Sequence, residues 1–277
     1  MEESSGMRRT LAQSRLGRRL LAALERFKAD DLGTMAAALA FQAFLSLFPL
    51  MLLALSIAGF LLADDPAEWL RRFFDAVPGI GPLVERDLDA VVEARGGLGL
   101  IALAGVAWAA SGLTGRASDA LGRIFRVPGR NVVRRRARSL VAMLVLGAAL
   151  FAALVASGAI AAIHAEGWWW LPVRALTLVA IAGLELAFFA GTYAVLTPAG
   201  GPALRDHLPG ALLMTAGWEI LKLVGGVLVV AVVNRSSALY GAIGAVFGLL
   251  VFLRVAASLY LVGAELSALL AERRADP

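Results

Sequence analysis

Four ionisable residues lie in the middle of long apolar stretches of this sequence: Glu185, Glu219, Lys222 and Arg254. A charge in hydrocarbon costs about 2.5–3.5 kcal/mol on insertion scales, so each needs either a partner or a function. Two are acidic and two are basic. Glu219 and Lys222 share a helix face, which leaves Glu185 and Arg254 as the natural pair between helices, although the partners can be exchanged.

Two interpretations of these charges remain open. In the first, they line a polar path or a substrate site inside a helical bundle. In the second, they are buried pairs that hold helices together. Glu265 lies near the end of the last apolar stretch, from which its carboxylate can reach the membrane interface.

A second polar group lies in the first apolar stretch, where Gln42 and Ser46 are four residues apart and Pro49 follows. Proline removes the amide that would bond the Leu45 carbonyl, so a bend is expected there. The two polar side chains either compensate the freed carbonyl or line a cavity.

Small residues mark the last two apolar stretches and predict close helix packing, with a gating hinge as the alternative. These residues are Gly225, Gly226, Gly241, Gly244 and Gly248.

Six apolar stretches position these residues. They span about 34–62, 98–113 with an extension to 120, 140–163, 171–196, 208–233 and 239–270. Crossing hydrocarbon takes about 20 residues, and a crossing segment must satisfy its own backbone, which favours helices. Because 60% of the residues are apolar and 17% are charged, the sequence predicts an all-α polytopic membrane bundle.

The positions of Lys and Arg predict the orientation of this bundle. Eighteen of them fall in segments 1–33, 114–138, 197–207 and 272–277, against six in the connections on the other side. Both termini are therefore expected in the cytoplasm. The 98–113 stretch is short, but without it the basic block at 132–138 would lie outside.

Three connecting segments are expected to lie on the membrane surface. Amphipathic patterns mark an N-terminal segment (1–33) and a basic cytoplasmic connection (114–138), and a helical hairpin is expected at 64–97 on the outer side. The transmembrane domain then covers 34–271 and a short tail 272–277. The pattern positions are Leu16, Leu20, Leu24 and Phe27, and then Ala117, Leu121, Ile124 and Phe125.

Several kinds of chemistry have no support in the sequence. It contains no cysteine and two histidines, His164 and His207, without a second ligand at metal spacing. It has neither a Gly-x-Ser-x-Gly elbow nor a Walker-type phosphate loop. We therefore expect no metal, no cofactor and no enzymatic activity. The net charge of +5 is assigned to topology and to anionic lipid headgroups, not to nucleic acid.

Motifs along the chain resemble the YihY/BrkB family of bacterial inner-membrane proteins. They are Ala37-Ala38-Leu39-Ala40-Phe41, Ser46-Leu47-Phe48-Pro49-Leu50, Trp108 with Ala110-Ser111-Gly112-Leu113, Tyr240-Gly241-Ala242 and Gly263-Ala264-Glu265-Leu266. The resemblance covers the chain after about residue 20.

The resemblance implies six transmembrane helices in the inner membrane, and members of the family have been discussed as virulence factors and as lipid or ion transporters. Gln42 stands where the family pattern has an aromatic residue. An older label, ribonuclease BN, is not supported, because the chain lacks a His-x-His-x-Asp-His site.

Two functions follow as hypotheses. The first is a transporter or exporter of a lipid, an ion or a small solute, with its path in a polar centre formed by the first, fourth, fifth and sixth apolar stretches. The second is a membrane scaffold that does not transport. Homo-oligomerisation stays open.

Overall fold

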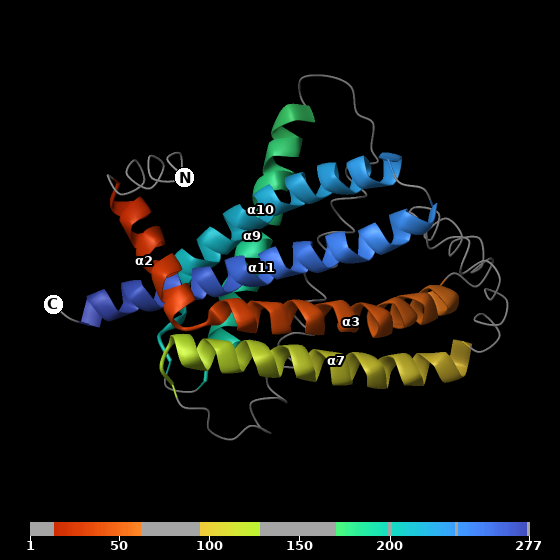
Figure 1. The fold of residues 1–277 in the computed structure, drawn as a ribbon, viewed down its shortest axis with the longest axis horizontal. Helices are drawn as coiled ribbons and strands as arrows, with labels where there is room; N and C mark the ends of the chain where they lie inside the picture. Colours follow the sequence, from red (N-terminus) through yellow and green to blue (C-terminus); the bar gives the residue numbers. More distant parts are fainter. Residues whose placement is uncertain (1–13, 62–94, 128–169, 199–200, 236–237, 276–277) are drawn as a thin grey trace. The chain divides into compact units, whose positions relative to one another are not determined.

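The computed structural model describes residues 14–61, 95–127, 170–198, 201–235 and 238–275. All regular secondary structure in these stretches is α-helical (Figure 1). The helices are α2 (Arg15–Ala29), α3 (Leu32–Leu61), α7 (Arg95–Ile124), α9 (Trp170–Leu196), α10 (Leu204–Arg235) and α11 (Ala238–Ala275).

Five of these helices coincide with predicted apolar stretches, and α3 and α9 agree with the prediction to within two residues at each end. Among the described residues, three helical segments are long and apolar enough to cross a membrane: Leu32–Leu50, Ala175–Leu196 and Val246–Arg274. The predicted stretch 140–163 and the outer hairpin up to residue 94 lie outside the described residues.

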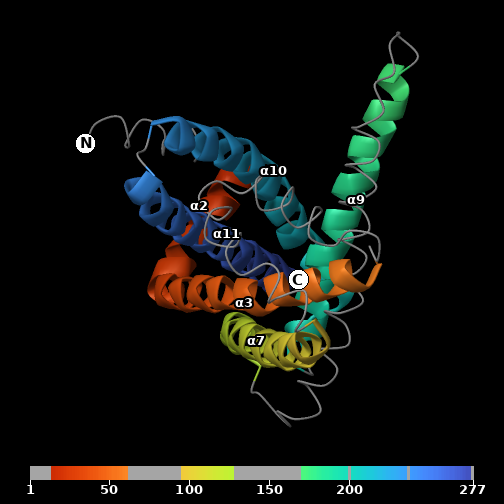
Figure 2. The ribbon, with the colours of Figure 1, turned by 90° about the vertical axis from the view of Figure 1, so that its right-hand side faces the viewer.

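The chain divides into two compact units, and several helices contribute to both. The first unit contains residues 1–36, 114–219 and 258–277, and the second contains 37–113 and 220–257. Helices α2 and α9 belong wholly to the first unit, whereas α3, α7, α10 and α11 each place one end in either unit. Helices α10 and α11 lie side by side (Figure 2).

Helix α2 packs against protein. Its Ala23 forms a buried cluster with Val262 and Leu266 of α11, and Leu20 and Phe27 pack against the same cluster. The sequence predicts that this apolar stripe rests on lipid. In the structure, Leu20 and Phe27 of this stripe pack partly against α11, and Leu24 stays exposed. Contact of the stripe with lipid stays a prediction.

The start and the end of the described chain are tied together in the first unit. The Arg26 guanidinium donates two hydrogen bonds to the Glu272 carboxylate, at 2.7 and 3.1 Å. Helix α2 itself begins where the Ser14 hydroxyl accepts a hydrogen bond from the Gly17 amide. These contacts place α2 beside the C-terminal end of α11.

Helix α7 runs without a break through residues predicted to form a separate surface helix. Ala117, Leu121 and Ile124 are buried in the first unit, so their apolar face also meets protein and not lipid. The Ser118 hydroxyl donates to the Leu196 carbonyl at the end of α9. The helix ends in a Schellman motif, in which Arg126 has a φ of 53° and the Val127 amide bonds the Gly122 carbonyl.

Candidate functional site

Helices α10 and α11 of the first unit cross in close contact at two glycines. A Cβ added to Gly263 would lie 2.7 Å from the Gly210 carbonyl oxygen, and one added to Gly210 would meet the Gly263 carbonyl oxygen. Real Cβ atoms essentially never come closer than 3.0 Å. The two backbones therefore touch directly, which only glycine allows here.

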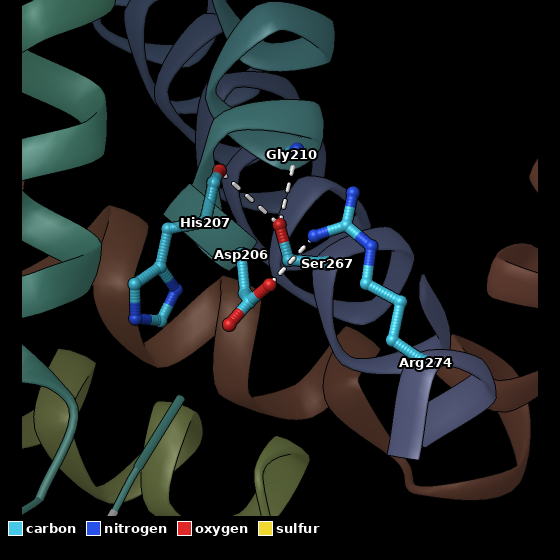
Figure 3. A network of polar contacts seen from close by, with 5 residues as sticks. All are labelled: Asp206, His207, Gly210, Ser267 and Arg274. Atoms are coloured by element: carbon cyan, nitrogen blue, oxygen red, sulfur yellow. Dashed lines mark hydrogen bonds and ion pairs between the residues drawn. The ribbon is translucent and has the colours of Figure 1, made fainter. Parts of the chain in front are cut away.

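A serine connects the same two helices by hydrogen bonds. The Gly210 amide donates to the Ser267 hydroxyl oxygen at 3.0 Å, and that hydroxyl donates to the His207 carbonyl at 3.2 Å (Figure 3). Ser267 is fully buried. It thus satisfies backbone groups in the first turns of α10 from a position on α11.

Tyr193 joins α9 to this crossing. Its hydroxyl donates to the Tyr260 carbonyl at 2.6 Å, and the two rings lie 4.5 Å apart. A Cβ at Gly263 would come within 2.6 Å of the Tyr193 hydroxyl oxygen. Glycine at 263 therefore makes room for the tyrosine as well as for α10.

His207 lies in the first turns of α10, and no part of its surface is exposed. Its ring lies 5.0 Å from the perpendicular ring of Phe125 and 6.1 Å from the ring of Tyr193. Neither ring nitrogen makes a hydrogen bond with a described residue. We call Phe125, Tyr193, His207, Tyr260 and Ser267 the histidine cluster.

Two kinds of influence act on the pKa of His207 in opposite directions. Burial lowers the pKa of the imidazole from its usual 6.5, while the neighbouring Asp206 carboxylate and the Pro202 carbonyl favour the protonated ring. Burial is the larger influence. Asp206 itself accepts a hydrogen bond from Arg274 of α11 at 2.7 Å.

In the second unit, Gln42 and Pro49 lie against the glycines of α7. A Cβ at Gly112 would come within 2.6 Å of the Gln42 amide nitrogen, and one at Gly105 within 3.1 Å of the Pro49 ring. Helices α3 and α7 therefore lie side by side (Figures 1 and 2). The Ser46 hydroxyl donates to the Gln42 carbonyl at 2.7 Å, so it bonds a carbonyl one turn before itself and not that of Leu45.

The predicted charged residues are distributed over both units. Glu185 and Glu265 are buried in the first unit, where Glu219 is half-buried. Lys222 and Arg254 belong to the second unit, where Arg254 is exposed. The pairing of Glu185 with Arg254 joins residues of different units and stays a prediction.

The glycines predicted to mediate packing differ in their surroundings. A Cβ at Gly225 would come within 2.9 Å of the Phe252 ring, whereas at Gly248 nothing lies within 4 Å. Close packing among the described residues is thus found at Gly225 and not at Gly248. For Gly226, Gly241 and Gly244 it stays a prediction.

Comparison with known proteins identifies the family. The model of the family described as "Virulence factor BrkB" matches residues 23–277. This chain belongs to the BrkB family. The inner membrane protein YhjD of Escherichia coli (strain K12) is 27% identical over 290 residues, covering 93% of this chain and 82% of the relative. No solved structure gives a significant match.

Membership of the BrkB family confirms the resemblance that the sequence motifs indicate. It makes the chain a membrane protein, in agreement with the three long apolar helical segments found in the described part of the chain. Residues 23–277 contain every residue of the histidine cluster.

The histidine cluster of this BrkB protein is not among the residues predicted from the sequence. Tyr193 and Tyr260 are two of only three tyrosines in the chain, and a phenol inside an apolar helix needs a hydrogen-bond partner. That requirement is a usable signal for Tyr193. His207 carried no such signal, because its burial depends on helices α7 and α9, which are remote in sequence.

Proposed function

We propose that this protein is a multi-pass transporter of the bacterial inner membrane that moves a lipid, an ion or a small solute. The observation that carries the proposal is the burial of ionisable side chains on helices able to cross a membrane. Glu185 on α9 is 3% exposed, and Glu265 on α11 is 1% exposed. Carboxyl groups at such positions mark substrate and ion paths in membrane proteins, because burying them for packing alone is costly.

The histidine cluster supports the same proposal. It places a hydroxyl, an imidazole and two phenols on α9, α10 and α11 in the same unit as both carboxyl groups. These side chains can donate and accept hydrogen bonds. A polar path through the first unit would run past Glu185 and this cluster.

We also propose that both termini lie in the cytoplasm. The excess of Lys and Arg in the two terminal segments and in two of the connections supports this orientation. The Arg26–Glu272 ion pair supports the same side for both ends, since it joins α2 to the end of α11. The E. coli relative is an inner membrane protein.

Single cysteines test the orientation in a chain that has none of its own. In intact cells, cysteines replacing Lys28 and Arg273, which are both exposed, are expected to resist a membrane-impermeant maleimide and to react after lysis. A cysteine at Arg235, which lies between the predicted stretches 208–233 and 239–270 on the outer side, is the control that reacts in intact cells. Labelling of Lys28→Cys or Arg273→Cys without lysis would contradict the orientation.

Flux into proteoliposomes tests the transport proposal. The full chain is reconstituted in phosphatidylethanolamine and phosphatidylglycerol vesicles and assayed for proton, sodium and potassium flux and for movement of a fluorescent phospholipid. We expect at least one flux above that of empty vesicles. Glu185→Gln should reduce it by about tenfold, which corresponds to only ~1.4 kcal/mol of barrier.

Glu25→Gln provides the matched control, because Glu25 is exposed on α2 and the chemical change is the same. It should leave flux unchanged. Equal flux in both variants would remove Glu185 from the path. No flux of any kind above empty vesicles would contradict the transport proposal.

The alternative proposal is a membrane scaffold whose cytoplasmic face binds anionic lipid headgroups. The observation that favours it is a group of exposed basic residues in the first unit, namely Arg116, Arg123, Arg126, Arg205 and Arg273. Guanidinium groups bind phosphate well. If the scaffold proposal holds, Glu185→Gln lowers thermal stability and wild-type vesicles show no flux.

A further inference from the structure

The His207 imidazole is fully buried, neither ring nitrogen has a close hydrogen-bond partner among the described residues, and the Pro202 carbonyl is the neighbouring backbone acceptor. Buried polar groups are nearly always hydrogen-bonded, so an exception needs an explanation. A neutral imidazole has one donor and one acceptor, whereas the protonated ring has two donors. The ring lies between the rings of Phe125 and Tyr193. Uptake of a proton would change the number of hydrogen-bond donors on the imidazole, and it requires no space for a larger ligand.

We propose that the His207 imidazole is a proton-binding site, and that its protonation loosens the crossing of α10 and α11 and so regulates transport through the first unit. The effect on transport rests on the proposed function. The binding of the proton does not.

The groups that face His207 decide what the protonated ring can bond. Its own helix contributes Asp206, the residues just before that helix contribute the Pro202 carbonyl, and α11 contributes Arg274, which holds the Asp206 carboxylate at 2.7 Å. The Ser267 hydroxyl bonds the His207 carbonyl and not the ring. Helix α9 contributes the phenol of Tyr193, and α7 contributes only the apolar ring of Phe125. Asp206 is therefore the anion available to an imidazolium.

The Arg274 guanidinium should bind the Asp206 carboxylate less firmly than a buried imidazolium would. Its side chain is 59% exposed while that of Asp206 is 14% exposed, so the guanidinium can return to water at little cost. A buried imidazolium has no such option. Once His207 is protonated, Asp206 is expected to turn from Arg274 towards the ring, which breaks the tie between the end of α11 and the start of α10.

A movement of His207 reaches the helix crossing through a short chain of contacts. The His207 carbonyl accepts from Ser267, which accepts from the Gly210 amide, and Gly210 touches Gly263 (Figure 3). Because the glycine backbones are in direct contact, a small shift of the first turns of α10 must separate or slide the two helices.

The pH dependence has a definite sign. Burial lowers the pKa of His207, so near pH 6.5 the unfolded chain binds more protons than the folded protein. The stability contributed by the neutral ring is complete above the unfolded pKa of about 6.5. It declines as the pH falls through that value, until the folded pKa is reached.

The chain has two histidines, so a His164→Gln background leaves His207 as the sole imidazole. In this full-length protein in detergent micelles, histidine NMR signals are followed from about pH 8 to about pH 5. We expect a titration below that of free histidine. The thermal midpoint should fall with pH in the same range, and fall less after His207→Gln is added.

Asp206→Asn serves as the second variant, since it keeps the imidazole and removes its anion. It should move the titration to still lower pH. The proposal is overturned if the His207 signals titrate like free histidine or stay unchanged by Asp206→Asn. It is also overturned if the thermal midpoint falls equally with pH in the His164→Gln protein and in the protein that carries His207→Gln as well. These measurements need no flux, so a failed transport assay leaves them intact.

Discussion

Gly210→Ala and Gly263→Ala are each expected to prevent the protein from accumulating in a folded form. Each new methyl group would occupy space now held by the backbone of the facing helix. A backbone cannot rotate away as a side chain can. Overpacking a tight interior costs about 1–3 kcal/mol, and more when helices must separate. These are therefore the largest effects expected of an added methyl group among the described glycines.

Gly183→Ala and Gly248→Ala are the matched controls, because nothing lies within 4 Å of a Cβ at either position. Alanine is a better helix former than glycine by about 0.5–1 kcal/mol, so both variants should be as stable as the parent or slightly more stable. Size-exclusion chromatography of heated, detergent-solubilised protein gives the yield and the thermal midpoint of all four. Equal midpoints across the set would show that α10 and α11 do not touch as described.

Gly112→Ala should fall between these extremes. Its methyl group would meet the amide of Gln42, the movable end of a flexible side chain. Adding Gln42→Ala should therefore restore any lost stability. No comparable second change can rescue Gly210→Ala, since its obstacle is main chain.

The positions of the helices could be predicted from sequence because few backbone conformations satisfy their own hydrogen bonds inside a membrane. A segment such as 171–196 must satisfy its own backbone in lipid, and α9 occupies Trp170–Leu196. The two amphipathic segments were correctly predicted to be helical. The packing of their apolar faces against protein was not predicted. Leu20 and Leu121 show only that one face is apolar, and neither periodicity nor charge distinguishes a lipid surface from α11 or α9.

The candidate site could be predicted only where a residue type is rare in its setting. Glu185 and Glu265 stand out because carboxyl groups seldom occur in apolar helices, and the structure buries both. Gly210 and His207 do not stand out. Their importance comes from contacts with Gly263 and Tyr193, residues more than ten positions away, and pattern reasoning along one helix cannot supply such contacts.

Tyr193→Ala is expected to unfold the first unit more readily than any other truncation of an aromatic ring in the described chain. The ring is fully buried and touches α10 and α11 through His207, Tyr260 and Gly263. Removing a large buried side chain leaves a cavity and costs about 3–5 kcal/mol. Phe41→Ala, at a ring that is 55% exposed, is the control and should have a small effect.

Tyr193→Phe separates the hydroxyl from the ring. It removes only the bond to the Tyr260 carbonyl, for which about 0.5–1.5 kcal/mol is expected. Unfolding in sodium dodecyl sulfate, followed by tryptophan fluorescence, should rank the variants as Phe41→Ala, then Tyr193→Phe, then Tyr193→Ala in increasing loss. If Tyr193→Ala proves no worse than Phe41→Ala, the ring does not join α9 to the crossing. In that case the histidine cluster does not couple a proton on His207, through Tyr193, to α9, the helix that carries Glu185.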